Sequence, residues 1–267
     1  MERFDYHVHT CYSHDGAYSA VEQLEAAAKT GISELCFTDH VDFDVRDESA
    51  QYLPADLSAL RCDLNKIGTE YKGVRIKLGA EISLADKTAA ELSKEYVMTA
   101  NPDFIIGSVH TVNMVDTYFP EYFVGKTKQT AYYAYLDTIY HGIKDCDIMS
   151  VLGHYDFVAK YAPFQDRRMT LNVSLELFTE IFKTLIANGK GIEINTSAWR
   201  DEPAWGSDIL KLYHEFGGEY VTTGSDAHNP NRLGRRLDEA VLLAKQAAIP
   251  YIATFDKLKP KFHSIQD

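Results

Sequence analysis

Short apolar runs that each end abruptly in polar residues alternate with helix-like segments along this chain. The runs have the length and the β-branched content of buried parallel strands. They cover residues 4–8, 34–38, 74–80, 104–109, 148–153, 191–195 and 219–223, with a weaker eighth run at 251–254. Strand and helix repeated in this way predict an α/β fold with a parallel sheet, and seven or eight such units are enough to close a barrel.

The segments between these runs have helical length. Ser19 and Glu22 have the spacing of a capping box, and Gly31 follows as a helix stop. Mixed apolar and charged faces predict further helices within residues 54–72, 86–100, 127–145, 174–188, 206–217 and 231–247. The sequence has no linker rich in proline, glycine and serine and no break in composition. We therefore expect residues 1–267 to form a single domain.

The histidines gather at the ends of the apolar runs. Seven of the ten histidines lie at the end of a run or in the loop just after it, and two carboxylates have the same kind of position. In a β/α barrel the carboxyl ends of the strands converge on one face, so these side chains should meet in one pocket. The nine residues are His7, His9, His14, His40, Glu81, His110, His154, Asp226 and His228.

This set of side chains favours a metal centre. His7 and His9 are two residues apart on a predicted strand, so their imidazoles point to the same side. Imidazole and carboxylate ligands together suit Zn, Fe or Mn, and no thiolate is required. A single histidine at a strand end is more often a hydrogen-bonded structural residue, but seven such placements are not explained in that way. Nine ligands exceed what one tetrahedral ion takes, which predicts two or three divalent ions with a carboxylate bridging a pair.

Charge and cysteine usage narrow the class of protein. The formal net charge of −12 argues against a long polyanionic partner such as duplex DNA. It leaves room for a small phosphorylated substrate, because bound cations set the local field. The four cysteines form no CxxC pair, which is typical of reduced thiols in a cytoplasm. The chain shows no signal-peptide pattern and no apolar run near the roughly 20 residues that cross a bilayer. We therefore expect a cytoplasmic protein without a membrane partner; its oligomeric state is left open.

Six motifs at the strand ends resemble those of the PHP (polymerase and histidinol phosphatase) family. The resemblance runs from residue 4 to about residue 235, which is nearly the whole chain. Within that family, residues 106–110 and 192–197 and the total length are most similar to the stand-alone histidinol-phosphate phosphatases. The motifs are His7-Val8-His9, Phe37-Thr38-Asp39-His40, Gly79-Ala80-Glu81, Gly107-Ser108-Val109-His110, Leu152-Gly153-His154 and Gly224-Ser225-Asp226-Ala227-His228.

The resemblance implies a distorted (β/α)7 barrel with a trinuclear metal site at the carboxyl ends of the strands. It also implies how the ligands are shared among the ions. One ion would be held by His7, His9, Glu81 and Asp226. A second ion would share Glu81 and take His110 and His154, and a third would take His14, His40 and His228.

The activity implied by the resemblance is hydrolysis of a phosphate monoester, with L-histidinol phosphate in histidine biosynthesis as the leading substrate. Bound cations would activate water and neutralise the phosphoryl oxygens. Glu81 would link two of the ions, and Asp226 or His228 would give a proton to the leaving alcohol. Two alternatives stay open. The same site could act on nucleotides, oligonucleotide ends or phosphotyrosine, or the metal could be purely structural in a non-catalytic domain.

Four further charged residues are candidates for substrate contacts. Arg200 and Lys160 each follow a strand-end motif, and either cation could clamp a phosphate, Arg200 in a bidentate manner. Asp42 and Asp44 lie just beyond His40 and could meet the cationic amine of an amino alcohol. Each of these charges could instead be a solvated surface group.

Overall fold

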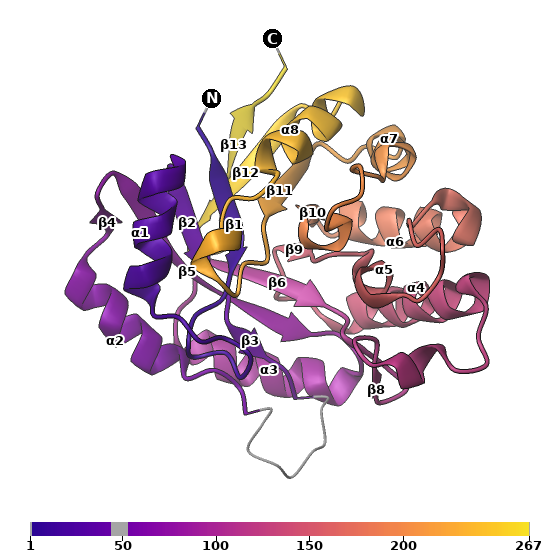
Figure 1. Cartoon of the computed structure of the whole chain (residues 1–267), viewed down its shortest axis with the longest axis horizontal. Helices are drawn as coiled ribbons and strands as arrows, with labels where there is room; N and C mark the ends of the chain where they lie inside the picture. Colours follow the sequence, from indigo (N-terminus) through magenta and orange to yellow (C-terminus); the bar gives the residue numbers. More distant parts are fainter. Residues whose placement is uncertain (1, 44–52, 267) are drawn as a thin grey trace.

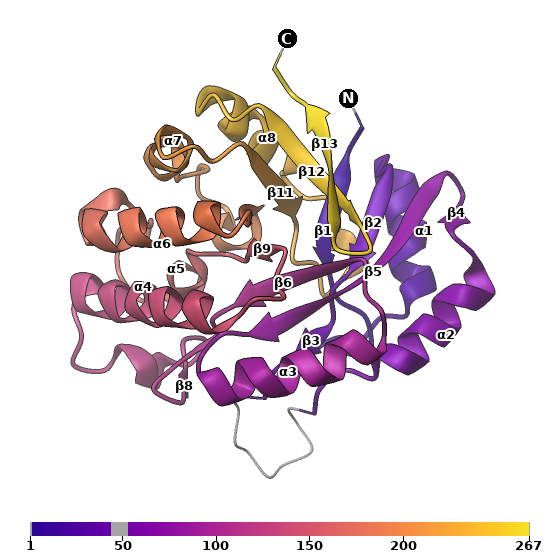
Figure 2. The same cartoon turned by 180° about the vertical axis from the view of Figure 1, so that it is seen from behind.

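A mostly parallel sheet forms the centre of the structure, and helices surround it (Figures 1 and 2). The computed structural model describes residues 2–43 and 53–266. The hydrogen-bonded order of the main sheet is β1-β2-β5-β6-β9-β10-β11-β12-β13, with β3 and β4 also paired to β5. The strands are β1 (Phe4–Val8), β2 (Glu34–Phe37), β3 (His40–Val41), β4 (Glu70–Tyr71), β5 (Val74–Ser83), β6 (Phe104–Ser108), β7 (Thr111–Val112), β8 (Val115–Asp116), β9 (Val151–Leu152), β10 (Gly191–Asn195), β11 (Tyr220–Gly224), β12 (Tyr251–Asp256) and β13 (Lys259–Ser264).

The two ends of the parallel series meet where β1 lies beside β11. A single bridge joins Val8 to Ala227, and the amide of His9 donates to the carbonyl of Ala227 at 3.1 Å. At the amino-terminal part of β11, β12 pairs in parallel with β11. On its other side, β12 pairs antiparallel with β13. The amide of Phe255 donates to the Tyr6 hydroxyl at 2.9 Å, so β12 also lies against β1. The sheet therefore curves into the predicted barrel-like form, with its closing edge joined by few backbone hydrogen bonds.

Helices cover the outside of the curved sheet, α1 to α3 beside its first half and α4 to α8 beside its second half (Figure 1). No helix in the described part of the chain is both long enough and apolar enough to cross a membrane. The helices are α1 (Ala20–Thr30), α2 (Leu57–Ile67), α3 (Lys87–Thr99), α4 (Lys128–Asp145), α5 (Phe157–Tyr161), α6 (Leu175–Ala187), α7 (Ser207–Glu215) and α8 (Leu237–Gln246), with 3₁₀ turns η2 (Pro120–Phe123), η3 (Leu171–Val173), η4 (Ser197–Trp199) and η5 (Pro230–Arg232).

Local sequence signals account for several of these boundaries. Ser19 caps α1 and forms a capping box with Glu22, and Gly31 ends the helix in the left-handed conformation, as predicted. The last helix begins later than the predicted residue 231. There Pro230–Arg232 forms a 3₁₀ turn and Arg236 takes a positive φ of 59° before α8 begins.

The sequence pattern missed the shorter elements. The β7–β8 hairpin and helix α5 both follow strand-end histidines, and β13 folds back on β12. Strand β5 runs on to Ser83, because β3 pairs with its last part on one side and β6 pairs on the other. The predicted α/β class and the parallel order of the main strands are confirmed.

Candidate metal centre

The strand ends bring the predicted ligands to one side of the sheet. Parallel strands run in the same direction, so the residues at their carboxyl ends share one edge of the fold. His7 and His9 come from the end of β1, and Glu81 comes from the last part of β5. His110, His154 and Asp226 each follow the end of a strand by two residues, after β6, β9 and β11 respectively.

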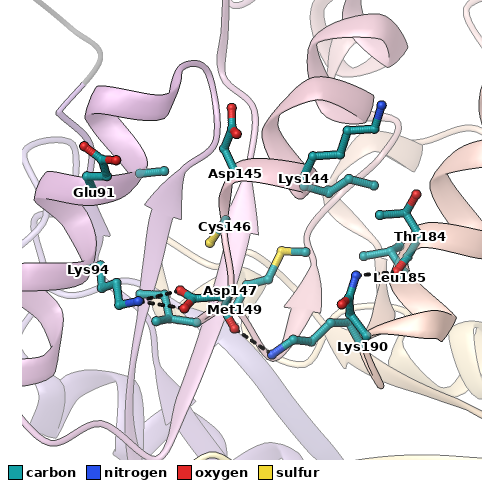
Figure 3. A pocket seen from close by; sticks show the side chains of 14 residues that line it. Glu91, Lys94, Lys144, Asp145, Cys146, Asp147, Met149, Thr184, Leu185 and Lys190 are labelled. Atoms are coloured by element: carbon teal, nitrogen blue, oxygen red, sulfur yellow. Dashed lines mark hydrogen bonds and ion pairs between the residues drawn. The ribbon is translucent and has the colours of Figure 1, made fainter.

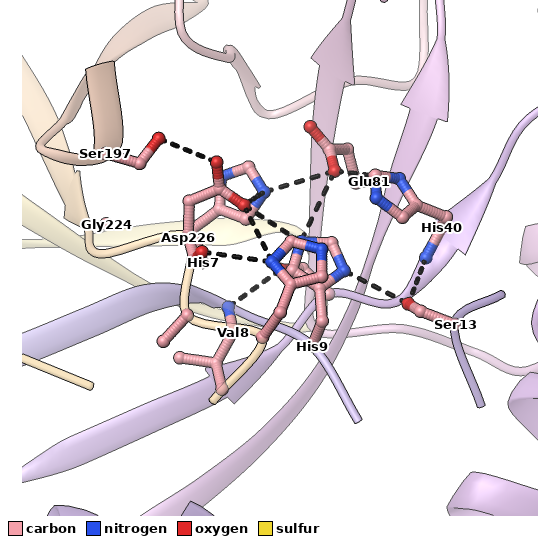
Figure 4. A network of polar contacts seen from close by, with 12 residues as sticks. His7, Val8, His9, Ser13, His40, Glu81, Ser197, Gly224 and Asp226 are labelled. Atoms are coloured by element: carbon pink, nitrogen blue, oxygen red, sulfur yellow. Dashed lines mark hydrogen bonds and ion pairs between the residues drawn. The ribbon is translucent and has the colours of Figure 1, made fainter. Parts of the chain in front are cut away.

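Four buried side chains form the inner part of the cluster. His7 and His9 lie side by side, with ring centroids 5.1 Å apart (Figure 4). Their Nε2 atoms lie 3.1 and 3.5 Å from Glu81 Oε2. The same two Nε2 atoms lie 3.8 and 3.4 Å from Asp226 Oδ1. Two imidazole nitrogens and two carboxylate oxygens therefore face one small volume.

Glu81 joins this volume to a second group of imidazoles. Its Oε1 atom lies 2.7 Å from His154 Nε2 and 3.3 Å from His110 Nε2. Its Oε2 atom lies 3.1 Å from His40 Nδ1. Glu81 is fully buried, so the contacts on both of its oxygens make it the hub of the cluster.

Asp42 lies inside the cluster. Its Oδ2 atom is 3.3 Å from Nδ1 of His40 and 3.3 Å from Nδ1 of His110. A carboxylate in that position can orient both imidazoles or share a cation with them. The neighbouring candidate Asp44 lies outside the described residues.

The outer part of the cluster contains an acid that the sequence pattern did not select. Asp15 Oδ2 lies 3.0 Å from His228 Nε2 and 3.7 Å from His40 Nε2. The ring of His228 stacks on His9, with centroids 4.0 Å apart. His14 lies farther out and is exposed, with its ring centroid 5.2 Å from that of His40.

The donor atoms fit divalent cations. In the described part of the chain, the buried atoms His7 Nε2, His9 Nε2 and Glu81 Oε2 have no hydrogen-bond partner, although they face one another. An unsatisfied buried polar atom costs about 1–3 kcal/mol, and a cation among these atoms would satisfy them together. The ligand atoms of four groups of residues lie within 4.8 Å of one another: His7, His9 and Asp226; His7, Glu81 and His154; His40, Asp42 and His110; and His9, His40 and His228.

Charges within the cluster shift the pKa values of the candidate ligands in different directions. Burial raises the pKa of Glu81, but the imidazoles of His7 and His110 outweigh it and hold this pKa well below its usual value. Burial raises the pKa of Asp226 too, and Lys160 and His7 reverse that effect. Burial lowers the pKa of His9, with the neighbouring His228 acting in the same direction. Ionised carboxylates and a neutral imidazole are the states that metal ligands need. Burial lowers the pKa of His7, but the carboxylates of Glu193 and Glu81 outweigh burial and hold this pKa well above its usual value, so a cation that binds there would displace a proton.

The cluster opens into a cavity of about 1000 Å³. Lys160 and Arg200, the two side chains predicted to bind phosphate, both line it. Lys160 Nζ lies 2.9 Å from Asp226 Oδ2. The Arg200 guanidinium lies over the Tyr161 ring, 4.7 Å from its centroid. The segment after β6 adds Asp116 and the exposed aromatic ring of Tyr118 to the cavity wall. The cavity therefore presents cationic, acidic and aromatic groups beside the cluster.

A second cavity lies away from this site. It has a volume of about 470 Å³ and lies between α3, α4 and α6, at the amino-terminal side of β9 (Figure 3). Lys94 pairs with the Asp147 carboxylate there at 2.7 Å, and Lys190 donates to the Asp147 carbonyl at 3.0 Å. Of the predicted site residues that the structure describes, none lines this cavity.

Buried acids behind the cluster were not identified from the sequence. Glu193 Oε1 lies 2.8 Å from His7 Nδ1. Asp39 accepts the Ser13 hydroxyl at 2.7 Å, and the same hydroxyl lies 3.1 Å from His9 Nδ1. One signal in the sequence could have identified Glu193. It is a charged residue within the otherwise uncharged run Gly191–Asn195, which forms a continuous strand.

Together, the fold and the site define a barrel-like α/β protein with a buried imidazole–carboxylate centre at the carboxyl ends of its strands. The PHP domain model matches residues 5–197. The chain belongs to this family. Histidinol-phosphatase from Lactococcus lactis is 29% identical over 97% of this chain and 96% of that protein. A probable histidinol-phosphatase from Clostridium acetobutylicum is 26% identical over 91% of this chain and 92% of that protein.

A solved structure shows the same fold. The crystal structure of histidinol phosphate phosphatase from Lactococcus lactis matches with a TM-score of 0.89 and 29% identity. The match covers 97% of this chain and 99% of that one. That protein is complexed with zinc, L-histidinol and phosphate.

Proposed function

We propose that this chain is a metal-dependent phosphomonoesterase that hydrolyses L-histidinol phosphate to L-histidinol and phosphate, late in histidine biosynthesis. The observation that carries the proposal is the convergence of His7, His9, Glu81 and Asp226 beside a cavity lined by Lys160. The full-length similarity to histidinol-phosphatases supports the choice of substrate. The proposed enzyme is a single PHP domain of the cytoplasm, which the free cysteines fit.

The proposed cofactor is two or three divalent cations, with zinc favoured over iron or manganese because the related crystal structure contains zinc. When bound, such cations lower the pKa of water and neutralise charge on phosphoryl oxygens. His7, His9, Glu81 and Asp226 would hold one ion, and Glu81 with His110 and His154 a second. A third would take His40 and His228, with His14 or Asp15 beside them.

Lys160 and Arg200 are the proposed phosphate contacts. Both line the cavity, and the side chain of Lys160 is 15% exposed, so its charge is only weakly screened by solvent. Arg200 is exposed and rests on Tyr161, which leaves its N–H groups free to turn toward a phosphate. These cations would bind the substrate phosphate and hold it beside the cluster.

The geometry favours His228 over Asp226 as the proton donor to the leaving alcohol. Asp226 Oδ2 already accepts from Lys160 at 2.9 Å and from the Ser197 hydroxyl at 2.8 Å. His228 Nδ1–H donates to the backbone carbonyl of Asp226 at 3.1 Å, so its Nε2 atom faces Asp15. His228 lines the cavity, which places that nitrogen within reach of a bound substrate. This role is an alternative to the ligand role of His228, because one Nε2 atom cannot carry a proton and bind a cation; with His228 as the proton donor, the site would hold two ions.

The amine of the substrate needs an acidic partner in the cavity. Asp42 is the candidate from the sequence, but its Oδ2 atom already contacts His40 and His110. Asp116 is a second candidate because it lines the same cavity. Its Oδ1 atom accepts only a local hydrogen bond from the Tyr118 amide among the contacts described, at 2.7 Å.

Phosphate release from a panel of esters tests the proposed function. Zinc-loaded protein is assayed with L-histidinol phosphate, a mononucleotide, an oligonucleotide with a terminal phosphate, and phosphotyrosine. The proposal expects the highest kcat/KM for L-histidinol phosphate. A higher kcat/KM for a nucleotide or for phosphotyrosine would show that the enzyme acts on that substrate class instead. No release from any ester by zinc-bound protein would support a structural metal site.

A further inference from the structure

Glu193 is a buried acid whose contacts connect two strands of the cluster. It lies on β10 and is 1% exposed. Its Oε1 atom lies 2.8 Å from His7 Nδ1. Its Oε2 atom accepts the backbone N–H of His154 at 3.0 Å and the side-chain amide of Asn195 at 3.2 Å. One carboxylate thus contacts a candidate ligand on β1, His7, and another just after β9, His154.

The shorter carboxylate contact of His7 is the one from Nδ1 to Glu193, which favours a proton on that nitrogen. Each contact of Glu193 is with a donor or with an imidazole nitrogen, so both of its oxygens act as acceptors. A neutral imidazole has one N–H, and a carboxylate that accepts from Nδ1–H leaves Nε2 with a lone pair. That Nε2 atom lies 3.1 Å from Glu81 Oε2, as described above. A lone pair facing a carboxylate is stable when a cation lies between them.

On the neighbouring strand β11, Gly224 leaves space for the side chains of Glu193 and His7 to approach each other. A Cβ atom at Gly224 would lie 2.1 Å from Glu193 Oε1 and 2.5 Å from His7 Cβ. Any side chain at this position would push the two residues apart. Glycine at the end of β11 is therefore required by the close approach of Glu193 to His7.

We infer that Glu193 is a positioning residue, which fixes His7 in the Nδ1–H form and so makes its Nε2 atom available to a divalent cation. Carboxylates behind a ligating histidine orient the ring and raise its basicity. Glu193 also holds the backbone of His154, so it sets the spacing of candidate ligands from two strands. The inference rests on the metal centre of the proposed function.

Glu193→Gln tests this role with little change in shape. The glutamine amide keeps one oxygen as an acceptor and has an NH2 donor in place of the other oxygen. That NH2 group would face either His7 Nδ1–H or the N–H of His154, so two donors would meet. Zinc affinity is measured by competition with a chromophoric chelator, and we expect it to fall by about 10- to 100-fold. Burial lowers the pKa of His7, but the Glu193 and Glu81 carboxylates raise it well above its usual value, so the tautomer is read at a pH at which the zinc-free ring is neutral. Under that condition, ¹⁵N NMR of the His7 ring should change from the Nδ1–H form in the wild type toward the Nε2–H form in the variant.

Glu34→Gln is the matched control. Glu34 is a buried glutamate on β2 that contacts the Tyr6 hydroxyl and Arg75, away from the candidate ligands. This variant should lower the melting temperature and leave the zinc affinity of the folded protein unchanged. A general loss of stability is thereby distinguished from a loss of ligand positioning.

The outcomes separate the inference from the function on which it rests. Wild-type protein that binds no zinc would remove the metal centre itself. Zinc affinity of folded Glu193→Gln within about twofold of the wild type, with His7 still in the Nδ1–H form, would overturn only the role of Glu193. The NMR measurement on the wild type needs no variant to fold, and finding His7 in the Nε2–H form there would also overturn the inference.

Discussion

Lys160 Nζ lies 2.9 Å from Asp226 Oδ2 and joins the short helix α5 to the loop after β11. The Ser197 hydroxyl donates to the same oxygen. Asp226 Oδ1 is thereby left to face His9, 3.4 Å away. The ammonium group of Lys160, which lines the cavity, thus also orients the carboxylate of Asp226, a candidate metal ligand.

Replacing Lys160 with methionine should weaken catalysis while the protein keeps its fold. Methionine keeps much of the apolar stem but removes the charge, so both the phosphate contact and one hydrogen bond to Asp226 are lost. A hydrogen bond to a charged group contributes about 1.5–3 kcal/mol, which corresponds to roughly 10- to 100-fold in kcat/KM. Steady-state kinetics measure the loss. Lys128→Met is the control, because Lys128 pairs with Asp166 and does not line the cavity.

Glu81→Ala should abolish turnover and deplete the bound metal. Glu81 contacts imidazoles with both of its oxygens, so its removal takes a ligand from both of the proposed ions that it links. Elemental analysis after dialysis, together with phosphate release, provides the measurement. Turnover at the wild-type rate with unchanged metal content would contradict the central role given to Glu81.

Arg200→Ala should raise the KM for L-histidinol phosphate several-fold and leave the zinc content unchanged. Arg200 lines the cavity and lies over Tyr161, but it lies in none of the candidate ligand groups of the described chain. Arg168→Ala is a suitable comparison, because Arg168 is exposed and pairs with Asp166 outside the cavity. Equal KM values for the two variants would remove Arg200 from the phosphate site.

Asp42→Asn distinguishes two roles for this residue. Its contacts with His40 and His110 predict that the amide variant loses zinc affinity by about 10- to 100-fold, as for other residues that orient ligands. An amine contact predicts a different result, in which KM rises and zinc affinity is unchanged. Chelator competition and kinetics on the same preparation decide between the two, and Asp116→Asn serves as the parallel test of the other acid.

Ser19→Ala should lower the free energy of unfolding by about 1 kcal/mol, because it removes the N-cap of α1. Activity should be unchanged, since Ser19 does not line the cavity. Ser19→Asp keeps a side chain that can cap the helix and should restore most of the stability. Urea denaturation of the three proteins measures the difference, and equal stability of wild type and Ser19→Ala would contradict the capping role.

The sequence by itself determined which kinds of side chain meet and at which end of the sheet. The two-residue period of a strand puts His7 and His9 on one side, and the common direction of parallel strands brings Glu81, His154 and Asp226 to the same edge. Helix α1 was predictable for a similar reason, because its cap and its glycine stop act within a few residues. These features depend on local backbone geometry, which a single sequence contains.

Only the tertiary structure decided which of these side chains touch. The contact of Glu193 with His7, that of Lys160 with Asp226 and the place of Asp42 between two imidazoles join segments that are distant in sequence, apart from the local pair Asp42 and His40. Such contacts depend on strand order, on how the sheet curves and on the rotamer of each side chain. The late start of α8 and the β7–β8 hairpin were missed for a related reason, because short elements carry weak periodic signals. The sequence therefore located the centre, and the packing of strands against one another determined its internal arrangement.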